Sequence, residues 1–156
     1  LPGTHSKWAR IEDSRIAAFT THMTGEAFAA LSQHTILGRL MQGESADDAA
    51  FDRGVARSAE SGGLLHHLFG ARTLVLAGQM AETGTRSYLS GLLIGHEVHA
   101  AAGAASAAES IDLAGEAHLC RLYARALSTL GHSTVIAPED AAMAGLARIG
   151  SLVKWS

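Results

Sequence analysis

The chain has 156 residues, of which 47% are hydrophobic and 17% charged, and its formal net charge is −3. This length fits one domain with a sizeable core, and the low, slightly acidic charge argues against a nucleic-acid-binding surface, which needs clustered basic residues. Every long apolar stretch is interrupted by Gly, His or Glu, so we expect neither a membrane-spanning segment nor a secretory signal.

The first eight residues combine a glycine, two hydroxyls and a cation. They read Leu1-Pro2-Gly3-Thr4-His5-Ser6-Lys7-Trp8. A turn of this composition can bring hydroxyl and backbone N–H donors to a phosphate, with a lysine ammonium nearby as a point charge. Taken alone, the pattern is more typical of an ordinary turn. The chain also begins without Met in what reads as a strand, so we expect it to be one lobe of a longer protein.

A β-hairpin and a helix are predicted next. Residues 7–12 alternate apolar and polar side chains, Asp13-Ser14 is a turn pair, and residues 15–23 read as the second strand. Thr24-Gly25-Glu26 then opens a helix over residues 27–41, for which Thr24 is the expected N-cap.

The middle of the chain reads as a series of helices. Ser45 is the expected cap of a helix that begins near residues 46–48 and breaks at Gly62-Gly63. Residues 64–76 are helical with a break at Gly70, and residues 78–84 form a loop. The longest periodic stretch covers residues 86–108, where small residues such as Gly91 and Gly95 permit another element to pack closely.

The last third alternates strands and helices. We predict strands over residues 110–115 and 133–137, a helix over 116–130 and a last helix over 138–152. In the first of these helices, the single cysteine, Cys120, is expected to be buried; one cysteine excludes an internal disulfide and fits a reducing cytoplasm. The last helix is expected to turn its apolar face inward. That face consists of Met143, Leu146, Ile149 and Val153.

This order is typical of a parallel α/β arrangement, in which ligands bind at the carboxyl ends of the strands. Gly115 and Pro138 therefore mark the candidate site.

The sequence does not contain the motifs that other catalytic or binding sites require. His96-Glu97-Val98-His99 does not match the zincin spacing, so we predict no metal site, and there is no Gly-x-Ser-x-Gly elbow, Walker loop or Gly-x-Gly-x-x-Gly fingerprint. Arg72 could hold a carboxylate, although a solvated helix arginine is the favoured interpretation.

Four motifs carry a resemblance that spans essentially the whole chain. They are Leu1 to Trp8, Met23-Thr24-Gly25-Glu26, Ser90-Gly91-Leu92-Leu93-Ile94-Gly95-His96-Glu97 and Leu113-Ala114-Gly115. Together they resemble the C-terminal half of the 2-dehydro-3-deoxygalactonokinase family, within the actin/hexokinase-like sugar kinases. The resemblance implies an α/β lobe of ribonuclease H-like topology, with an N-terminal β-hairpin, a helical insertion and a C-terminal β-α-β-α unit. Residues 1–156 would form this single domain, with the N-terminal lobe absent.

The resemblance also implies an activity and a set of site residues. The activity is ATP- and Mg²⁺-dependent phosphorylation of 2-dehydro-3-deoxy-D-galactonate at its 6-hydroxyl. By resemblance, the candidates for binding ATP and its phosphates are Gly3, Thr4, Ser6, Lys7, Ala114, Gly115 and Glu116. The candidates for the sugar acid are His5, Glu26 and Arg72. The Ser90 to Gly95 run resembles a helix packed at the hinge between the lobes.

Several alternatives stay open at this stage. No Asp of the chain is well placed as the base for the sugar hydroxyl, so we expect the base in the missing lobe and no turnover by this piece alone. The substrate could be a related 2-keto-3-deoxy sugar acid, because a single hydrogen bond can separate epimers. A non-catalytic actin-like lobe with a regulatory or assembly role is the competing class. A homo-oligomer is also possible.

Overall fold

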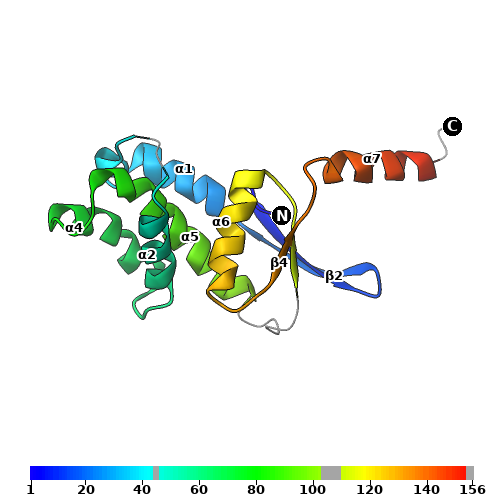
Figure 1. Ribbon diagram of the computed structural model, residues 1–156, viewed down its shortest axis with the longest axis horizontal. Coiled ribbons are helices and arrows are strands. Elements are labelled where there is room, and N and C mark those ends of the chain that lie inside the picture. The colour runs from blue at the N-terminus through cyan, green and yellow to red at the C-terminus, as the bar shows by residue number, and fades with distance from the viewer. Residues whose placement is uncertain (44–45, 103–109, 154–156) are drawn as a thin grey trace.

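The computed structural model describes residues 1–43, 46–102 and 110–153. Figure 1 shows a helical part, a β-hairpin that projects from it, and a strand–helix–strand unit followed by a last helix that points away. In chain order the elements are β1 (Ser6–Glu12), β2 (Arg15–His22), α1 (Thr24–His34), η1 (Gly38–Leu40), α2 (Asp48–Ser58), α3 (Gly63–Leu68), α4 (Gly70–Leu76), η2 (Glu82–Gly84), α5 (Thr85–Ala102), β3 (Ile111–Leu113), α6 (Ala117–Ser128), β4 (Thr134–Ile136) and α7 (Ala141–Leu152). The expected mixture of α and β structure is confirmed.

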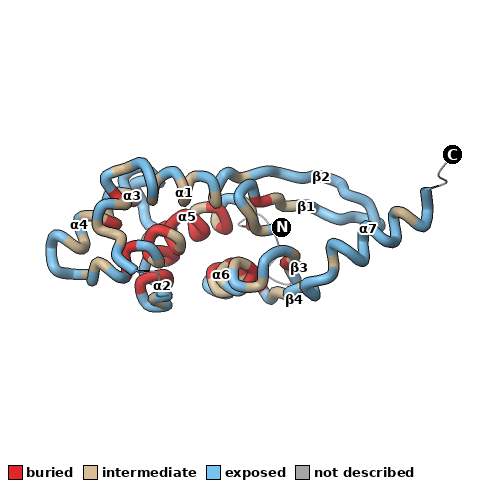
Figure 2. Tube along the Cα trace, turned by 90° about the horizontal axis from the view of Figure 1, so that it is seen from above, coloured by how far each residue is buried: buried red, intermediate tan, exposed pale blue. Residues whose placement is uncertain are grey.

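The predicted hairpin is confirmed. Strands β1 and β2 pair antiparallel, from Ser6 opposite His22 to the turn at Asp13 and Ser14. These two turn residues have φ angles of 49° and 61°, the left-handed backbone that a two-residue hairpin turn requires. Beyond Trp8 the hairpin projects from the body of the molecule, and almost all its residues are exposed (Figure 2).

Helix α1 is shorter than predicted and is capped differently. The helix ends at His34 instead of continuing to residue 41, because the Thr35 hydroxyl donates to the Leu31 carbonyl and accepts from the Leu37 amide, which turns the chain back. Thr24 is the first helical residue and not the N-cap. The predicted Ser45 cap lies outside the described residues, and Asp47 caps α2 by accepting a hydrogen bond from the Ala50 amide at 2.9 Å.

Helices α2 and α5 cross at very short distance. A Cβ atom on Gly91 would overlap the Phe51 carbonyl, and one on Gly54 would overlap the Tyr88 carbonyl. The small residues of α5 therefore do permit close packing, as predicted. Their neighbour is α2 of the same chain. The expected place of the Ser90 to Gly95 run at the hinge between the lobes stays a prediction.

Helix α5 is the centre of the core and joins two clusters of buried side chains, which colour it red in Figure 2. Its first half packs with α2, α4 and the segment after α1; the buried members are Leu37, Ala50, Ala71, Tyr88, Leu89, Leu92 and Leu93. Its second half packs with α2, α6 and β3; the buried members are Phe51, Val55, Ile94, Val98, Ala102, Leu113, Cys120, Tyr123, Ala126 and Leu127. The prediction of a buried Cys120 is confirmed.

The predicted parallel strand pair is confirmed. Strand β3 pairs parallel with β4, with Ile111 opposite Thr134 and Leu113 opposite Ile136, and α6 connects the two strands. The Ala137 amide donates to the Leu113 carbonyl at 2.7 Å, so the two strands end side by side. The loop that holds Gly115 and the loop that holds Pro138 leave from this shared edge, as the sequence predicted.

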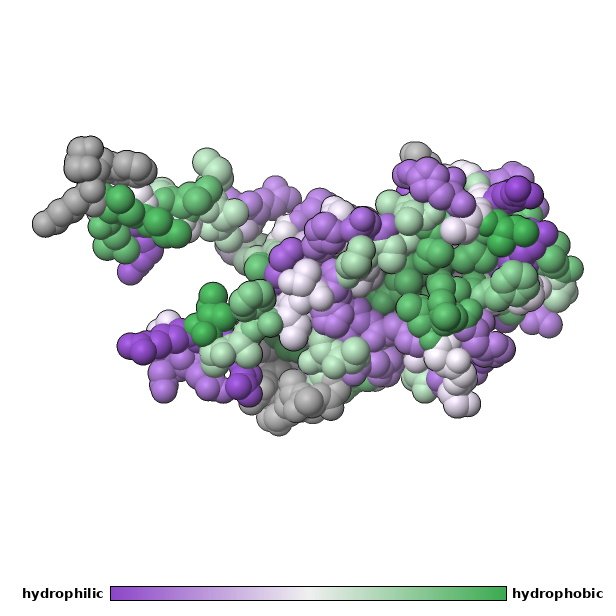
Figure 3. Space-filling view, turned by 180° about the vertical axis from the view of Figure 1, so that it is seen from behind, coloured by the Kyte–Doolittle hydropathy of each residue, from purple (hydrophilic) through white to green (hydrophobic). Residues whose placement is uncertain are grey.

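The prediction for the last helix, over residues 138–152, is wrong about where the helix begins and about where its apolar face points. Helix α7 begins at Ala141, and its apolar residues face solvent instead of a core. The exposed side chains include Met143, Leu146, Ile149 and Leu152. Figure 3 shows α7 and the hairpin as two arms that extend from the body with apolar surface on both. Periodicity identified an apolar face correctly, but no described element covers it.

No helix in the described part of the chain combines the length and the apolar character needed to cross a membrane.

Candidate functional site

The turn formed by residues 2–5 lies against the N-terminus of α1. The Glu26 amide donates a hydrogen bond to the Thr4 carbonyl at 3.0 Å. A Cβ atom on Gly25 would lie 2.7 Å from both the Gly3 carbonyl oxygen and the Thr4 Cα. The two backbones therefore touch, and only glycine at position 25 permits this approach.

The same turn also lies against the loop between β3 and α6. A Cβ atom on Gly115 would lie 3.0 Å from the Pro2 carbonyl oxygen and 3.6 Å from the Cys120 Sγ. The structure thus brings together two segments that the sequence places more than a hundred residues apart. The first atom that a side chain on Gly115 would meet in this chain belongs to Pro2.

Polar side chains gather on the exposed side of this turn. Thr4 and His5 are exposed, and the His5 Nε2 lies 2.5 Å from the Glu26 Oε2, each side chain being 49% exposed. The Lys7 ammonium donates to the His5 carbonyl at 2.7 Å. The Thr4 hydroxyl and the Lys7 ammonium can therefore donate to an anionic ligand at this turn, and the Glu26 carboxylate can accept from a ligand hydroxyl.

Ser6 faces the opposite way, into the protein. Its side chain is 1% exposed, and its hydroxyl donates to the Glu97 Oε1 at 2.5 Å. The Trp8 indole donates to the same oxygen at 2.7 Å, and the Tyr123 hydroxyl donates to Oε2 at 2.6 Å. This corrects the expectation that the Ser6 hydroxyl faces a phosphate, because strand β1 begins at Ser6 and alternates its side chains between the two faces.

Sequence reasoning missed the role of Glu97. The sequence places Glu97 in the His96 to His99 pattern and at the end of the Ser90 to Glu97 motif, with no role of its own, whereas the structure buries its carboxylate among three hydrogen-bond donors. Burial, followed by the hydrogen bond to Glu97, raises the pKa of Tyr123, so this hydroxyl keeps its proton and remains a donor. A carboxylate within an otherwise apolar helical face was the signal that could have identified it.

Ala114 and Glu116 flank Gly115, and Glu116 has a structural task. Its carboxylate caps α6 by accepting hydrogen bonds from the His118 amide at 2.7 Å and the Leu119 amide at 2.8 Å. These two bonds lower the pKa of Glu116, so its charge persists at acidic pH. The cap fixes the direction in which the chain leaves the loop at Gly115.

Arg72 lies elsewhere. It belongs to α4, at the far end of the helical part from the hairpin in both views (Figures 1 and 2). The buried Ala71 beside it anchors α4 to the first half of α5, which keeps the arginine away from the turn at residues 2–5. The structure does not bring Arg72 to the other candidates, and the arginine is half-buried on α4.

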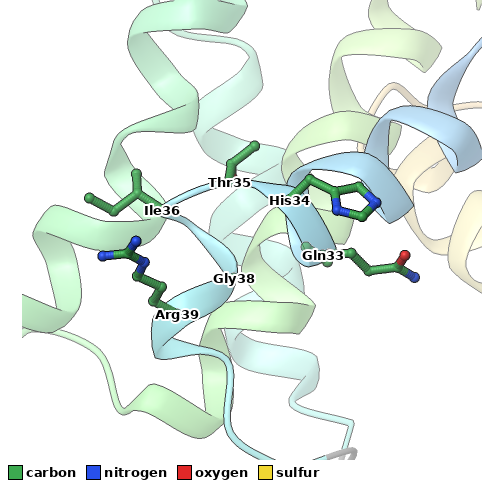
Figure 4. A pocket seen from close by; sticks show the side chains of 7 residues that line it. Gln33, His34, Thr35, Ile36, Gly38 and Arg39 are labelled. Carbon is green, nitrogen blue, oxygen red and sulfur yellow. The ribbon is translucent and has the colours of Figure 1, made fainter.

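Two other features offer no convergent chemistry. A hollow at the end of α1 is shown in Figure 4, where His34 and Arg39 point in different directions. The His67 Nδ1 lies 3.1 Å from the His96 Nε2, but within residues 1–43, 46–102 and 110–153 no three His, Cys, Asp or Glu side chains are grouped as metal ligands.

Comparison with known proteins agrees with the sequence motifs. The model of the 2-keto-3-deoxy-galactonokinase family matches residues 1–149. The chain is 36% identical over 151 residues to a Rhizobium meliloti protein named "Probable 2-dehydro-3-deoxygalactonokinase", and 30% identical over 154 residues to the Escherichia coli 2-dehydro-3-deoxygalactonokinase. The alignments cover 94% and 98% of this chain but 49% and 53% of those proteins.

A solved structure gives the same result. The crystal structure of a Sinorhizobium meliloti protein, described as a "putative 2-dehydro-3-deoxygalactonokinase protein", superposes with a TM-score of 0.87 at 35% sequence identity. The match covers 97% of this chain and 52% of that one, so the chain spans about half the length of the proteins it resembles. On the family match over residues 1–149 and on these alignments, the chain belongs to the 2-keto-3-deoxy-galactonokinase family.

Proposed function

We propose that this chain is the nucleotide-binding half of a kinase that transfers the γ-phosphoryl group of ATP to 2-dehydro-3-deoxy-D-galactonate. One observation carries the proposal: the turn at Gly3 and Thr4 is packed between the N-terminus of α1 and the loop at Gly115. This arrangement puts the proposed phosphate-binding turn next to the proposed adenosine-binding loop, as one nucleotide would require.

The phosphates are proposed to bind at the exposed side of the turn. The Thr4 hydroxyl and the Lys7 ammonium supply a donor and a positive charge there. The loop formed by Ala114, Gly115 and Glu116 receives the adenosine. Ser6 contributes to the turn from inside, through Glu97, and not as a phosphate ligand.

The sugar acid is proposed to bind beside the phosphates, at the pair formed by His5 and Glu26. Each side chain is half exposed and has hydrogen-bonding capacity left for substrate hydroxyls. We leave Arg72 out of this proposal because of its position on α4.

The reaction itself needs positioning and charge neutralisation more than covalent chemistry. The 6-hydroxyl oxygen of the sugar acid attacks the γ-phosphorus, the bond from that phosphorus to the β,γ-bridging oxygen breaks, and ADP departs. A base in the other half of the protein takes the hydroxyl proton. Mg²⁺, which usually binds through substrate phosphates and water, would neutralise the phosphate charge. Thr4 and Lys7 are the residues placed to face those phosphates.

We propose that residues 1–156 form one domain, the C-terminal lobe of a two-lobe protein, with a ribonuclease H-like topology. The exposed apolar side chains of the hairpin, of α7 and of the residue after it support a second lobe, because apolar side chains gathered on such projecting elements are normally covered in the working protein. They are Ile11, Ile16, Phe19, Met143, Leu146, Ile149, Leu152 and Val153. The cytoplasm, where ATP is abundant, is the proposed location.

The test is an ADP-release assay on the full-length protein, with ATP and Mg²⁺ and with 2-dehydro-3-deoxy-D-galactonate and its gluconate epimer offered separately. Turnover with the galactonate compound is the expected result. Turnover with the epimer alone would keep the kinase and overturn the substrate. A folded protein that binds ATP and phosphorylates neither acid would overturn the proposal in favour of a non-catalytic lobe.

A further inference from the structure

Glu97 is a buried carboxylate for which the proposed reaction has no direct use. It lies on α5, its side chain is 4% exposed, and no lysine, arginine or histidine of the described residues forms an ion pair with it. Burying a charge without a counter-ion is unfavourable unless hydrogen bonds replace the lost water. Three hydrogen bonds from neutral donors do so here.

These three bonds come from two separate elements. Oε1 accepts from Ser6 and Trp8, which lie two residues apart and therefore on the same face of β1. Oε2 accepts from Tyr123 on α6. One carboxylate on α5 thus fastens the first residues of β1 and the body of α6 at the same time.

The residues on the other face of β1 follow from this attachment. Because side chains alternate along a strand, holding Ser6 and Trp8 inward directs Lys7 outward and sets the course of the turn before it. Tyr123 is part of α6, whose capped N-terminus carries the loop at Gly115. Both segments of the proposed nucleotide site therefore depend on the same carboxylate for their relative position.

We infer that Glu97 is a positioning residue of the proposed kinase site: its carboxylate holds the turn at residues 3–5 in register with the loop at Gly115. The inference rests on the proposed function. Glu97 touches neither ATP nor the sugar acid, and it acts through Ser6, Trp8 and Tyr123. A conformational role explains why a charged side chain occupies a site where an apolar residue of similar volume would pack without a desolvation penalty.

The test compares Glu97→Gln with Val98→Ala in the full-length protein. Glutamine keeps the shape but loses the charge and one acceptor, whereas Val98→Ala loosens the same helix in the core and removes none of the three hydrogen bonds to Glu97. We expect Glu97→Gln to lower kcat by about ten- to a hundredfold, as small misplacements in active sites do, and to weaken the rise in Tm on adding ATP and Mg²⁺. Val98→Ala should lower Tm but leave kcat unchanged well below Tm.

A double-mutant cycle keeps the inference testable if Glu97→Gln folds poorly. Ser6→Ala removes one of the three bonds with little change in volume, and its effect on kcat should be non-additive with that of Glu97→Gln and additive with that of Val98→Ala. If Ser6→Ala alone has wild-type kcat and a wild-type response of Tm to ATP, the inference is overturned. The inference is also overturned if a folded Glu97→Gln variant has wild-type kcat and a wild-type response of Tm to ATP.

These outcomes are distinct from failure of the proposed function. A wild-type protein that phosphorylates neither acid would overturn both proposals. An active wild-type protein that is indifferent to the substitutions at Ser6 and Glu97 would overturn the positioning role alone.

Discussion

The Pro2 carbonyl oxygen lies 3.0 Å from the position that a Cβ atom on Gly115 would occupy. A contact this short leaves no room for a side chain unless the turn at residues 2–4 moves by a few tenths of an ångström. The glycine therefore matters for the turn within this chain as well as for any nucleotide bound there.

Replacing Gly115 with alanine should displace the turn and weaken ATP binding. We expect the KM for ATP to rise on the order of tenfold, about 1.4 kcal/mol, and the KM for the sugar acid to change by much less. Valine should have the larger effect. Gly145→Ala, at a position with nothing within 4 Å, is the control. Equal changes in both KM values would remove Gly115 from the adenosine site.

Replacing Thr4 with alanine should lower turnover. A hydrogen bond from this exposed hydroxyl to a charged phosphate oxygen is worth about 1.5–3 kcal/mol, so kcat should fall roughly ten- to a hundredfold. Sugar-acid binding should weaken only modestly. Thr4→Ser keeps the hydroxyl and should restore most of the rate. Unchanged kcat in the alanine variant would dismiss the phosphate role of the turn.

Replacing Gly91 with alanine should destabilise the fold without any direct effect on the site. The added Cβ would overlap the Phe51 carbonyl, and backbone cannot move aside as a side chain can. We expect a loss of about 1–3 kcal/mol or more in the free energy of unfolding, measured in urea. Gly150→Ala in α7, where the added carbon meets nothing within 4 Å, serves as the comparison. Equal stability of the two variants would contradict the α2–α5 crossing.

A histidine pair should make stability depend on pH. The His67 Nε2 faces the Ser61 carbonyl at 3.0 Å and must donate to it, so the neutral pair has the His96 Nε2–H donating to the His67 Nδ1 at 3.1 Å. Burial and the neighbouring His67 and His99 lower the pKa of His96. The unfolded chain therefore takes up the proton that makes His96 a cation at a higher pH than the folded chain does.

The stability contribution of His96 is complete above about pH 6.5, its unfolded pKa. It is lost as the pH falls from there toward the lower folded pKa, because protons favour the unfolded chain. Urea unfolding at pH 7.5 and pH 5.5 should show a smaller difference in His96→Gln than in the wild type. His118→Gln, at an exposed position, should keep the wild-type difference. The prediction would be contradicted if the free energy of unfolding changed equally between the two pH values in the wild type and in both variants.

Local sequence was enough for most of the secondary structure. The turn at Asp13-Ser14 lies where it was predicted, and the breaks predicted at Gly62-Gly63 and Gly70 lie within a few residues of the observed ones, over residues 59–62 and at Phe69. These features depend on residues next to one another. The parallel arrangement of the last two strands also followed from the order of the elements. The end of α1 did not, because it depends on a threonine hydroxyl that competes for backbone hydrogen bonds.

The candidate site, too, could be predicted from local sequence only in part. Glycine, hydroxyl and charged residues in the first eight positions identified the turn, and a glycine after a strand identified the second loop. Only the tertiary structure brought Pro2 to Gly115, turned Ser6 inward and placed Arg72 at the other end of the helical part. A carboxylate on an apolar helical face singled out Glu97, but its hydrogen-bond partners could not be read from the sequence, since those on β1 lie 91 and 89 residues away in the chain.

The sequence alone thus determined which elements form and which of their faces are apolar, because turns, breaks and periodicity act between neighbouring residues. Tertiary structure decided which of those faces are covered and which polar groups meet. The apolar face of α7 and the carboxylate of Glu97 illustrate the difference. Both lie on regular helices, yet one faces solvent and the other is buried among donors, because burial depends on distant segments that no local pattern records.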